Sequence, residues 1–210
     1  MIKKTFLAAT LLAATASAQA ELVEFDWEVA DDGHVTLDTQ SGNIWLDLGL
    51  TANMSINDVK SLVEDDSRFS GWRLPTVEEV HELAANTFDI DPSMVYSGSN
   101  GVSNEQFTQH SLIGYDTSYT YGLFEKDGKS YLFGSNSRDV YLNFHQSESL
   151  DFKVSSRGIY LVSNDYNIAY DEVSINELMN PSVSDVSAPM ALGAFGLMLG
   201  LAGMRSRKSS

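Results

Sequence analysis

The stretch Gly71-Trp72-Arg73-Leu74-Pro75-Thr76-Val77-Glu78-Glu79-Val80 decides how this 210-residue chain folds. Thr76 and Glu79 have the spacing of a capping box, in which the Thr hydroxyl accepts from a first-turn amide and the Glu carboxylate accepts from the Thr amide. Pro75 disfavours a helical conformation at Leu74, so an extended segment ends where a helix begins. We therefore expect a junction between a strand and a helix at this point.

Two short amphipathic helices are predicted around this junction. The helix after Thr76 has an apolar face made of Val77, Val80, Leu83 and Ala84. Upstream, Ser55 and Asp58 repeat the capping pattern ahead of the apolar residues in 56–63. The turn-forming residues 64–71 separate the two helices.

Trp72 and Arg73 have two interpretations. In the first, Trp72 is buried between a sheet and a helix, and Arg73 pairs with a nearby carboxylate. In the second, both side chains bind a ligand. The first arrangement is the more common in proteins, so we expect Trp72 in the core.

The junction and the segment before it resemble a known family. Residues 71–80 are similar to the signature of the DUF1566 (Lcl C-terminal-like) domains of bacterial secreted proteins. Residues 38–47 and 55–59 resemble the version of that domain found in PEP-CTERM proteins, which are sorted by exosortases, and the resemblance reappears at 158–162. It implies a C-type lectin-like fold with structural roles for the motif residues Trp45, Asp47, Trp72, Arg73, Pro75, Thr76 and Glu79.

Alternating and turn-forming segments predict that the class is α+β, with antiparallel hairpins in a single domain. Strict alternation over residues 22–29 predicts a half-buried strand with Val29 on its apolar side, and Asp31-Asp32-Gly33 turns the chain into a strand at 34–38. Further strands are expected at 44–48, 119–125, 130–134, 140–144 and 158–162, the last closing the sheet. Asp127-Gly128 is typical of a two-residue hairpin turn. Residues 89–104, rich in Ser, Gly and Asn, are expected to form a long surface loop.

Both ends of the chain have the pattern of export signals. Residues 1–20 have the basic, apolar and small-residue regions of a secretory signal peptide, with Ala18 and Ala20 at the cleavage site. Ala16-Ser17-Ala18 is an alternative site two residues earlier. We expect the DUF1566/Lcl-like domain to span residues 21–163 and a linker to span 164–185.

The C-terminal residues 186–210 resemble the PEP-CTERM sorting signal. A short motif of Val186, Ser187, Ala188 and Pro189 precedes an uncharged segment at 190–204 and a basic cluster of Arg205, Arg207 and Lys208. The motif departs from Val-Pro-Glu-Pro in lacking the glutamate. The apolar segment predicts a transmembrane helix near the shortest length that spans a bilayer, with the basic cluster cytoplasmic. A plain membrane anchor is the alternative to a sorting signal.

Composition limits the partners of the chain. The formal net charge is −16, from 13 Lys and Arg against 29 Asp and Glu, which disfavours binding to nucleic acid. The chain has no cysteine, so an exported form depends on packing rather than on disulfides. These properties fit a bacterial envelope protein.

No pattern in the sequence predicts catalysis, a cofactor or a metal. The four histidines lack metal-ligand spacing, and we expect each in solvent: His34, His81, His110 and His145. Glu78 and Glu82 are interpreted as a solvated helix face. Two acidic groups, Asp89 with Asp91 and Asp165 with Asp171 and Glu172, lack the spacing of a calcium loop.

Two functions follow as hypotheses. The first is a non-enzymatic cell-envelope or extracellular-matrix protein that is exported, anchored in the inner membrane by its tail, and processed near residues 186–189 by an exosortase-like enzyme. The second is binding of a glycan or exopolysaccharide, with Tyr119, Tyr121 and Tyr131 stacking on sugar faces near the loop at 89–104. Packing of these tyrosines within the sheet is the structural alternative.

Overall fold

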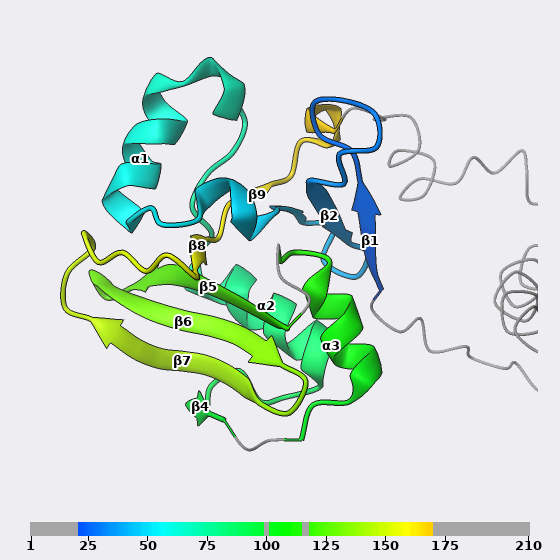
Figure 1. Cartoon of the computed structure of the whole chain (residues 1–210), viewed down its shortest axis with the longest axis vertical. Coiled ribbons are helices and arrows are strands. Elements are labelled where there is room, and N and C mark those ends of the chain that lie inside the picture. Colours follow the sequence, from blue (N-terminus) through cyan, green and yellow to red (C-terminus); the bar gives the residue numbers. More distant parts are fainter. Residues whose placement is uncertain (1–20, 99–100, 115–117, 170–210) are drawn as a thin grey trace, which may run out of the picture.

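The computed structural model describes residues 21–98, 101–114 and 118–169 (Figure 1). In this part of the chain the class is α+β, as predicted, with antiparallel sheets and three α-helices: α1 (Ile56–Asp65), α2 (Val77–Phe88) and α3 (Asn104–Ser111). No helix within the described ranges has the length and apolar character needed to cross a membrane. The expected signal peptide, sorting motif, tail helix and basic cluster lie outside these ranges.

A four-stranded antiparallel sheet joins the two ends of the described chain. Its order is β1 (Leu22–Phe25), β2 (Val35–Asp38), β3 (Ile44–Leu46) and β9 (Val162–Ser163). Every residue of β2 and β3 is buried. Central strands buried on both faces tie the N-terminal hairpin into the core.

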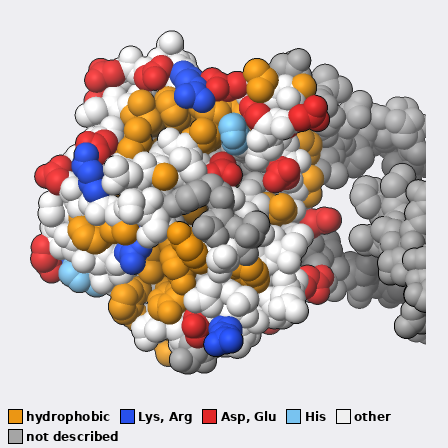
Figure 2. Space-filling model, viewed as in Figure 1, with side chains coloured by type: hydrophobic (Ala, Val, Ile, Leu, Met, Phe, Trp, Pro, Cys, Tyr) orange, Lys and Arg blue, Asp and Glu red, His pale blue; other side chains and the backbone are white. Residues whose placement is uncertain are grey.

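A five-stranded sheet forms the second layer. Its order is β4 (Tyr96–Ser97), β7 (Val140–Ser147), β6 (Lys129–Asn136), β5 (Tyr119–Lys126) and β8 (Gly158–Ile159), with β8 parallel to β5. The predicted turn between β5 and β6 is present, with φ of 53° at Asp127 and 72° at Gly128. Helices α2 and α3 lie behind this sheet in Figure 1, and Figure 2 shows hydrophobic side chains gathered on its front.

The predicted closing strand at 158–162 is wrong, because two short strands in different sheets replace it. The Tyr160 amide donates to Leu123 O of β5 at 3.1 Å, whereas the Leu46 amide of β3 donates to Leu161 O at 3.1 Å. The tyrosine and the leucine are fully buried in two different clusters of the core. The chain therefore crosses from one sheet to the other at this point.

The capping box predicted at the start of α2 is present. Thr76 Oγ1 accepts from the Glu79 amide at 3.2 Å, and the Glu79 carboxylate accepts from the Thr76 amide at 2.8 Å. That carboxylate also receives two bonds from Arg73, at 2.6 and 2.8 Å, so the guanidinium holds its pKa below the usual value. The Arg73 backbone pairs with Val162, which fixes the junction to β9.

Replacing Thr76 with Ala is expected to lower the free energy of unfolding by about 1 kcal/mol, because the first-turn amide loses its acceptor. Urea unfolding of the purified protein measures the change. Thr108→Ala is the matched control: Thr108 is an exposed threonine within α3 whose hydroxyl bonds back to Asn104 O at 2.8 Å. Its expected change stays within about 0.5 kcal/mol. Equal losses in the two variants would contradict a capping role.

A third helix, which the sequence did not predict, follows directly on the predicted loop at 89–104. Ser103 Oγ accepts from the Gln106 amide at 3.1 Å, and Gln106 Oε1 accepts from the Ser103 amide at 3.0 Å, so α3 begins with its own capping box. The prediction of two helices missed it because the helix is short and mostly polar. The loop itself also contributes β4 to the edge of the five-stranded sheet.

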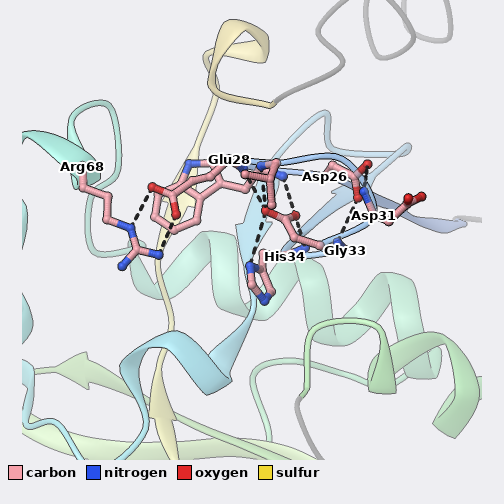
Figure 3. Close-up of polar contacts among 9 residues, drawn as sticks. Asp26, Glu28, Asp31, Gly33, His34 and Arg68 are labelled. Carbon is pink, nitrogen blue, oxygen red and sulfur yellow. Dashed lines mark hydrogen bonds and ion pairs between the residues drawn. The ribbon is translucent and has the colours of Figure 1, made fainter.

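The predicted strand at 22–29 ends at Phe25, where a loop held by two carboxylates begins (Figure 3). Asp32 accepts from the backbone amides of residues 27, 28, 29 and 34, and Asp26 accepts from those of 31 and 33. Burial opposes ionisation of Asp32, but these amides lower its pKa to about 2. Because the loop interrupts the strand, the alternating apolar residues no longer all point to one side. Val29 is 60% exposed rather than facing the core.

Candidate functional site

A row of four aromatic side chains crosses one face of the five-stranded sheet. Tyr121 and Tyr141 lie opposite the same β6 residue, Gly134, and their ring centroids are 5.7 Å apart. Tyr119 stacks on Tyr121, with centroids 5.1 Å apart and planes 19° apart. Phe144, which is 38% exposed, lies 6.1 Å from Tyr141. We call Tyr119, Tyr121, Tyr141 and Phe144 the aromatic row.

Glycine at position 134 permits this arrangement. A Cβ added to Gly134 would lie 2.4 Å from Tyr121 Cδ1 and 2.4 Å from Thr120 O. Such distances are shorter than packed atoms allow, and one of the two atoms belongs to the backbone. The ring of Tyr121 therefore occupies the space that a side chain on β6 would fill.

A β-bulge brings Phe144 to the same face as Tyr141. Residues three apart in a regular strand point to opposite faces, but the register of β6 and β7 shifts here and Asn143 has a φ of 54°. The Asn143 side-chain amide donates to Pro92 O at 3.0 Å and to Met94 O at 3.1 Å. The segment before β4 thus holds the bulge, and with it the end of the aromatic row.

Polar groups lie beside Tyr121. Asn136 Nδ2 donates to the Tyr121 hydroxyl at 3.0 Å, and the charges of Asp139 and Arg157 both act on the same hydroxyl. Burial raises the pKa of Tyr121, so the hydroxyl stays protonated at neutral pH. The Arg157 guanidinium donates through Nη1 to Gln146 Oε1 of β7. Stacking surface and hydrogen-bonding groups therefore occur together on this face.

The predicted group of three tyrosines is divided between the two faces of the sheet. Tyr131 lies opposite Phe124 in the register of β5 and β6, three residues from the position of Tyr121, and so points to the other face. There its ring centroid is 5.3 Å from His145, and Lys126 Nζ lies 5.6 Å from the ring. Tyr119 and Tyr121 belong to the aromatic row, whereas Tyr131 does not.

The motif residues lie in the core or at helix starts, and none of them belongs to the aromatic row. Trp45 is fully buried and meets Tyr160 edge-on at 5.8 Å, and Trp72 is 4% exposed. Burial raises the pKa of Asp47, whose carboxylate caps the 3-10 helix Leu48–Thr51. These positions support the structural interpretation of the motif.

The expectation that every histidine lies in solvent is wrong for His110. Its ring is fully buried, with Nδ1 2.8 Å from Ser135 Oγ and Nε2 3.3 Å from the Tyr160 hydroxyl. A Ser–His pair can form a nucleophilic site, but here both residues are fully buried and burial lowers the His110 pKa to about 3. His81 is half-buried and bonds to Asn143 at 2.9 Å. These contacts stabilise the fold.

Neither acidic group considered from the sequence forms a metal site in the described part of the chain. No set of three or more His, Asp or Glu side chains is suitably placed among residues 21–98, 101–114 and 118–169. Asp89 ends α2, Asp91 accepts from Ser93, and Asp165 begins the 3-10 helix Tyr166–Ile168. Asp171 and Glu172 lie outside the described ranges.

The aromatic row offers an apolar surface of half-buried and exposed rings, in which Tyr141 is set at 87° to Tyr121 and at 64° to Phe144, with hydrogen-bonding groups at its side. Such a surface can accept the apolar face of a sugar ring, while neighbouring polar groups fix the orientation of its hydroxyls. Sequence patterns indicated half of the row and missed Tyr141 and Phe144, whose joint placement depends on the bulge. The chain matches no protein-family model, no curated protein and no solved structure.

Proposed function

We propose that this chain is a non-enzymatic, exported protein of the bacterial cell envelope whose domain binds a glycan or a related surface polymer through the aromatic row. The observation that carries the proposal is the contiguity of the four rings across β5, β6 and β7. Aromatic rings on a sheet are rigid, so binding costs little side-chain entropy. The proposed ligand lies on the sheet rather than on the loop at 89–104.

The terminal sequence patterns and the family resemblance support the location. In this proposal residues 1–20 direct export, and an exosortase-like enzyme processes the tail near residues 186–189 after anchoring in the inner membrane. A C-type lectin-like fold for the domain belongs to the same proposal, and its support is the sequence resemblance over residues 38–87. Mass spectrometry of the mature protein tests the processing step. A mature protein that retains residues 190–210 would contradict processing and would favour a simple membrane anchor.

Replacing Tyr121 with Ala is expected to weaken polymer binding at least about tenfold, which corresponds to about 1.4 kcal/mol of binding free energy. The centre of the row disappears, and Tyr119 loses the ring on which it stacks. A glycan array identifies a ligand, and affinity electrophoresis of the full chain in gels containing that polymer measures the effect.

Tyr131→Ala is the matched control, because it removes the same side chain from the opposite face of the same hairpin. Its binding is expected to equal that of the wild type. Phe144→Ala, at an exposed end of the row, provides a second variant with a smaller effect on folding. An equal loss of binding in the Tyr121 and Tyr131 variants would contradict the assignment of the ligand to the face that carries the aromatic row. An array on which no glycan binds would contradict the proposed binding function.

A further inference from the structure

We infer that the polymer bound by the aromatic row is acidic, a glycan with carboxylate groups such as a polyuronate, and that Arg157 pairs with one of its carboxylates. This inference rests on the proposed function and names the class of its ligand. It starts from the surroundings of a single guanidinium at the side of the row.

Arg157 is a half-buried cation without an acidic partner among the described residues. Its Nη1 donates to Gln146 Oε1, while its Nε is buried and has no hydrogen-bond partner in that part of the chain. Five of the seven other basic side chains in the described ranges pair with a carboxylate: Lys60, Arg68, Arg73, Lys129 and Lys153. Of the other two, Lys126 donates to Asn143 Oδ1 at 3.1 Å on the opposite face of the sheet, and Arg138 is exposed. Even a half-buried charge without a counter-ion carries a desolvation cost, and this chain has 29 acidic residues from which a counter-ion could have come. A carboxylate supplied by a ligand would remove that cost.

The guanidinium is placed to meet a ligand on the row. Gly158 of β8 lies opposite Gly122 of β5, so Arg157 enters the sheet beside Tyr121. From there its side chain reaches Gln146 of β7, on the far side of β6. A sugar stacked on Tyr121 would present its ring substituents to the guanidinium, whose fork of N–H donors matches a carboxylate.

Local burial favours this pairing over general electrostatic attraction. Burial lowers the pKa of Arg157, which reports a poorly solvated guanidinium, and charge pairs are stronger where water is excluded. The formal net charge of −16 repels an anionic polymer from the molecule as a whole. A preference for acidic over neutral polymer must therefore come from a local cation.

Polygalacturonate and its fully methyl-esterified form test the inference, because they share one backbone and differ in charge. Affinity electrophoresis of the full chain is expected to show tighter binding to the acidic polymer. Arg157→Gln is expected to reduce that affinity at least about tenfold, or about 1.4 kcal/mol, to the level of the methyl ester. Binding to the methyl ester is expected to stay unchanged in this variant.

Lys153→Gln is the matched control, since it removes one positive charge from the same loop but from an existing pair with Asp58. The Lys153 variant is expected to keep the full preference for the acidic polymer over the methyl ester. Arg157→Lys is expected to keep part of that preference. The inference is overturned if the wild-type chain binds both polymers equally, or if the folded Arg157 variants retain the full preference; the proposed function then stands. An absence of binding to both polymers and to an array of neutral glycans overturns the two together.

Discussion

Replacing Trp72 with Ala is expected to lower the free energy of unfolding by about 3 to 5 kcal/mol, measured by denaturant unfolding. The side chain is 4% exposed and meets Trp27 edge-on, with ring centroids 6.0 Å apart; Phe69 lies 5.4 Å from Trp27 on another side. The cluster that contains these rings includes residues of α1 and of both sheets. The cavity would therefore open where the elements of the domain meet.

Two further variants separate a cavity from other causes. Trp72→Phe keeps most of the packed volume and removes an indole N–H that has no partner among the described residues, so its loss is expected to be smaller. Phe144→Ala deletes an aromatic ring that is 38% exposed and is expected to cost less than about 1 kcal/mol. An unchanged unfolding midpoint for Trp72→Ala would place this side chain outside the core and return it to a ligand-binding role.

Short-range patterns predicted the local structure well. The capping boxes at Ser55 and Thr76 and the turn at Asp127-Gly128 are present because each depends on a few neighbouring residues and on backbone conformations that those residues favour. The burial of Trp72 followed from the same kind of reasoning. Composition and alternation then sufficed for the α+β class.

Long-range packing decided the parts that the sequence did not predict. The alternation at 22–29 has the period of a strand, yet the Asp26 and Asp32 carboxylates bind backbone amides and fold part of it into a loop. Residues 158–162 have the sequence pattern of one strand, but they contribute to two different sheets. These outcomes depend on partners distant in sequence, which a local pattern does not contain.

The candidate site shows the same limit. Tyr119 and Tyr121 were proposed as aromatic side chains of the predicted hairpin, but the choice between Tyr131 and Tyr141 depends on strand register, and Phe144 joins the row only through the bulge at Asn143. A single shift of register changes the face that a side chain occupies. The position of Arg157, in the segment that leads into β8, carries no sequence signal of a ligand.

Lowering the pH from about 7 to about 4 is expected to reduce the free energy of unfolding by about 3 kcal/mol through His110 alone, at about 1.4 kcal/mol per pH unit. Burial lowers the pKa of this histidine from 6.5 to about 3 in the folded protein. Between these two values the unfolded chain binds a proton that the folded chain does not. Stability is therefore constant with respect to this group above pH 6.5 and falls as the pH falls below it.

The surroundings of His110 offer nothing that stabilises an imidazolium. Phe88 of α2 and Phe133 of β6 pack against the ring, with centroids 5.1 and 4.8 Å away. The polar contacts are the neutral hydroxyls of Ser135 and Tyr160, and burial raises the pKa of Tyr160 well above its usual value. The contacts described for the ring include no carboxylate, so protonation requires the site to open.

His110→Gln isolates this contribution, because other groups that titrate between pH 7 and 4 are common to both proteins. Glu79, for example, has its pKa lowered by Arg73, and stability from that pair is lost in both as the carboxylate becomes protonated. The variant is expected to be less stable at pH 7 but to lack the decrease between about pH 6.5 and 5, where most carboxylates remain ionised. Urea unfolding at a series of pH values measures both curves. Parallel curves would mean that His110 accepts a proton in the folded protein, which its complete burial among aromatic rings and neutral hydroxyls opposes.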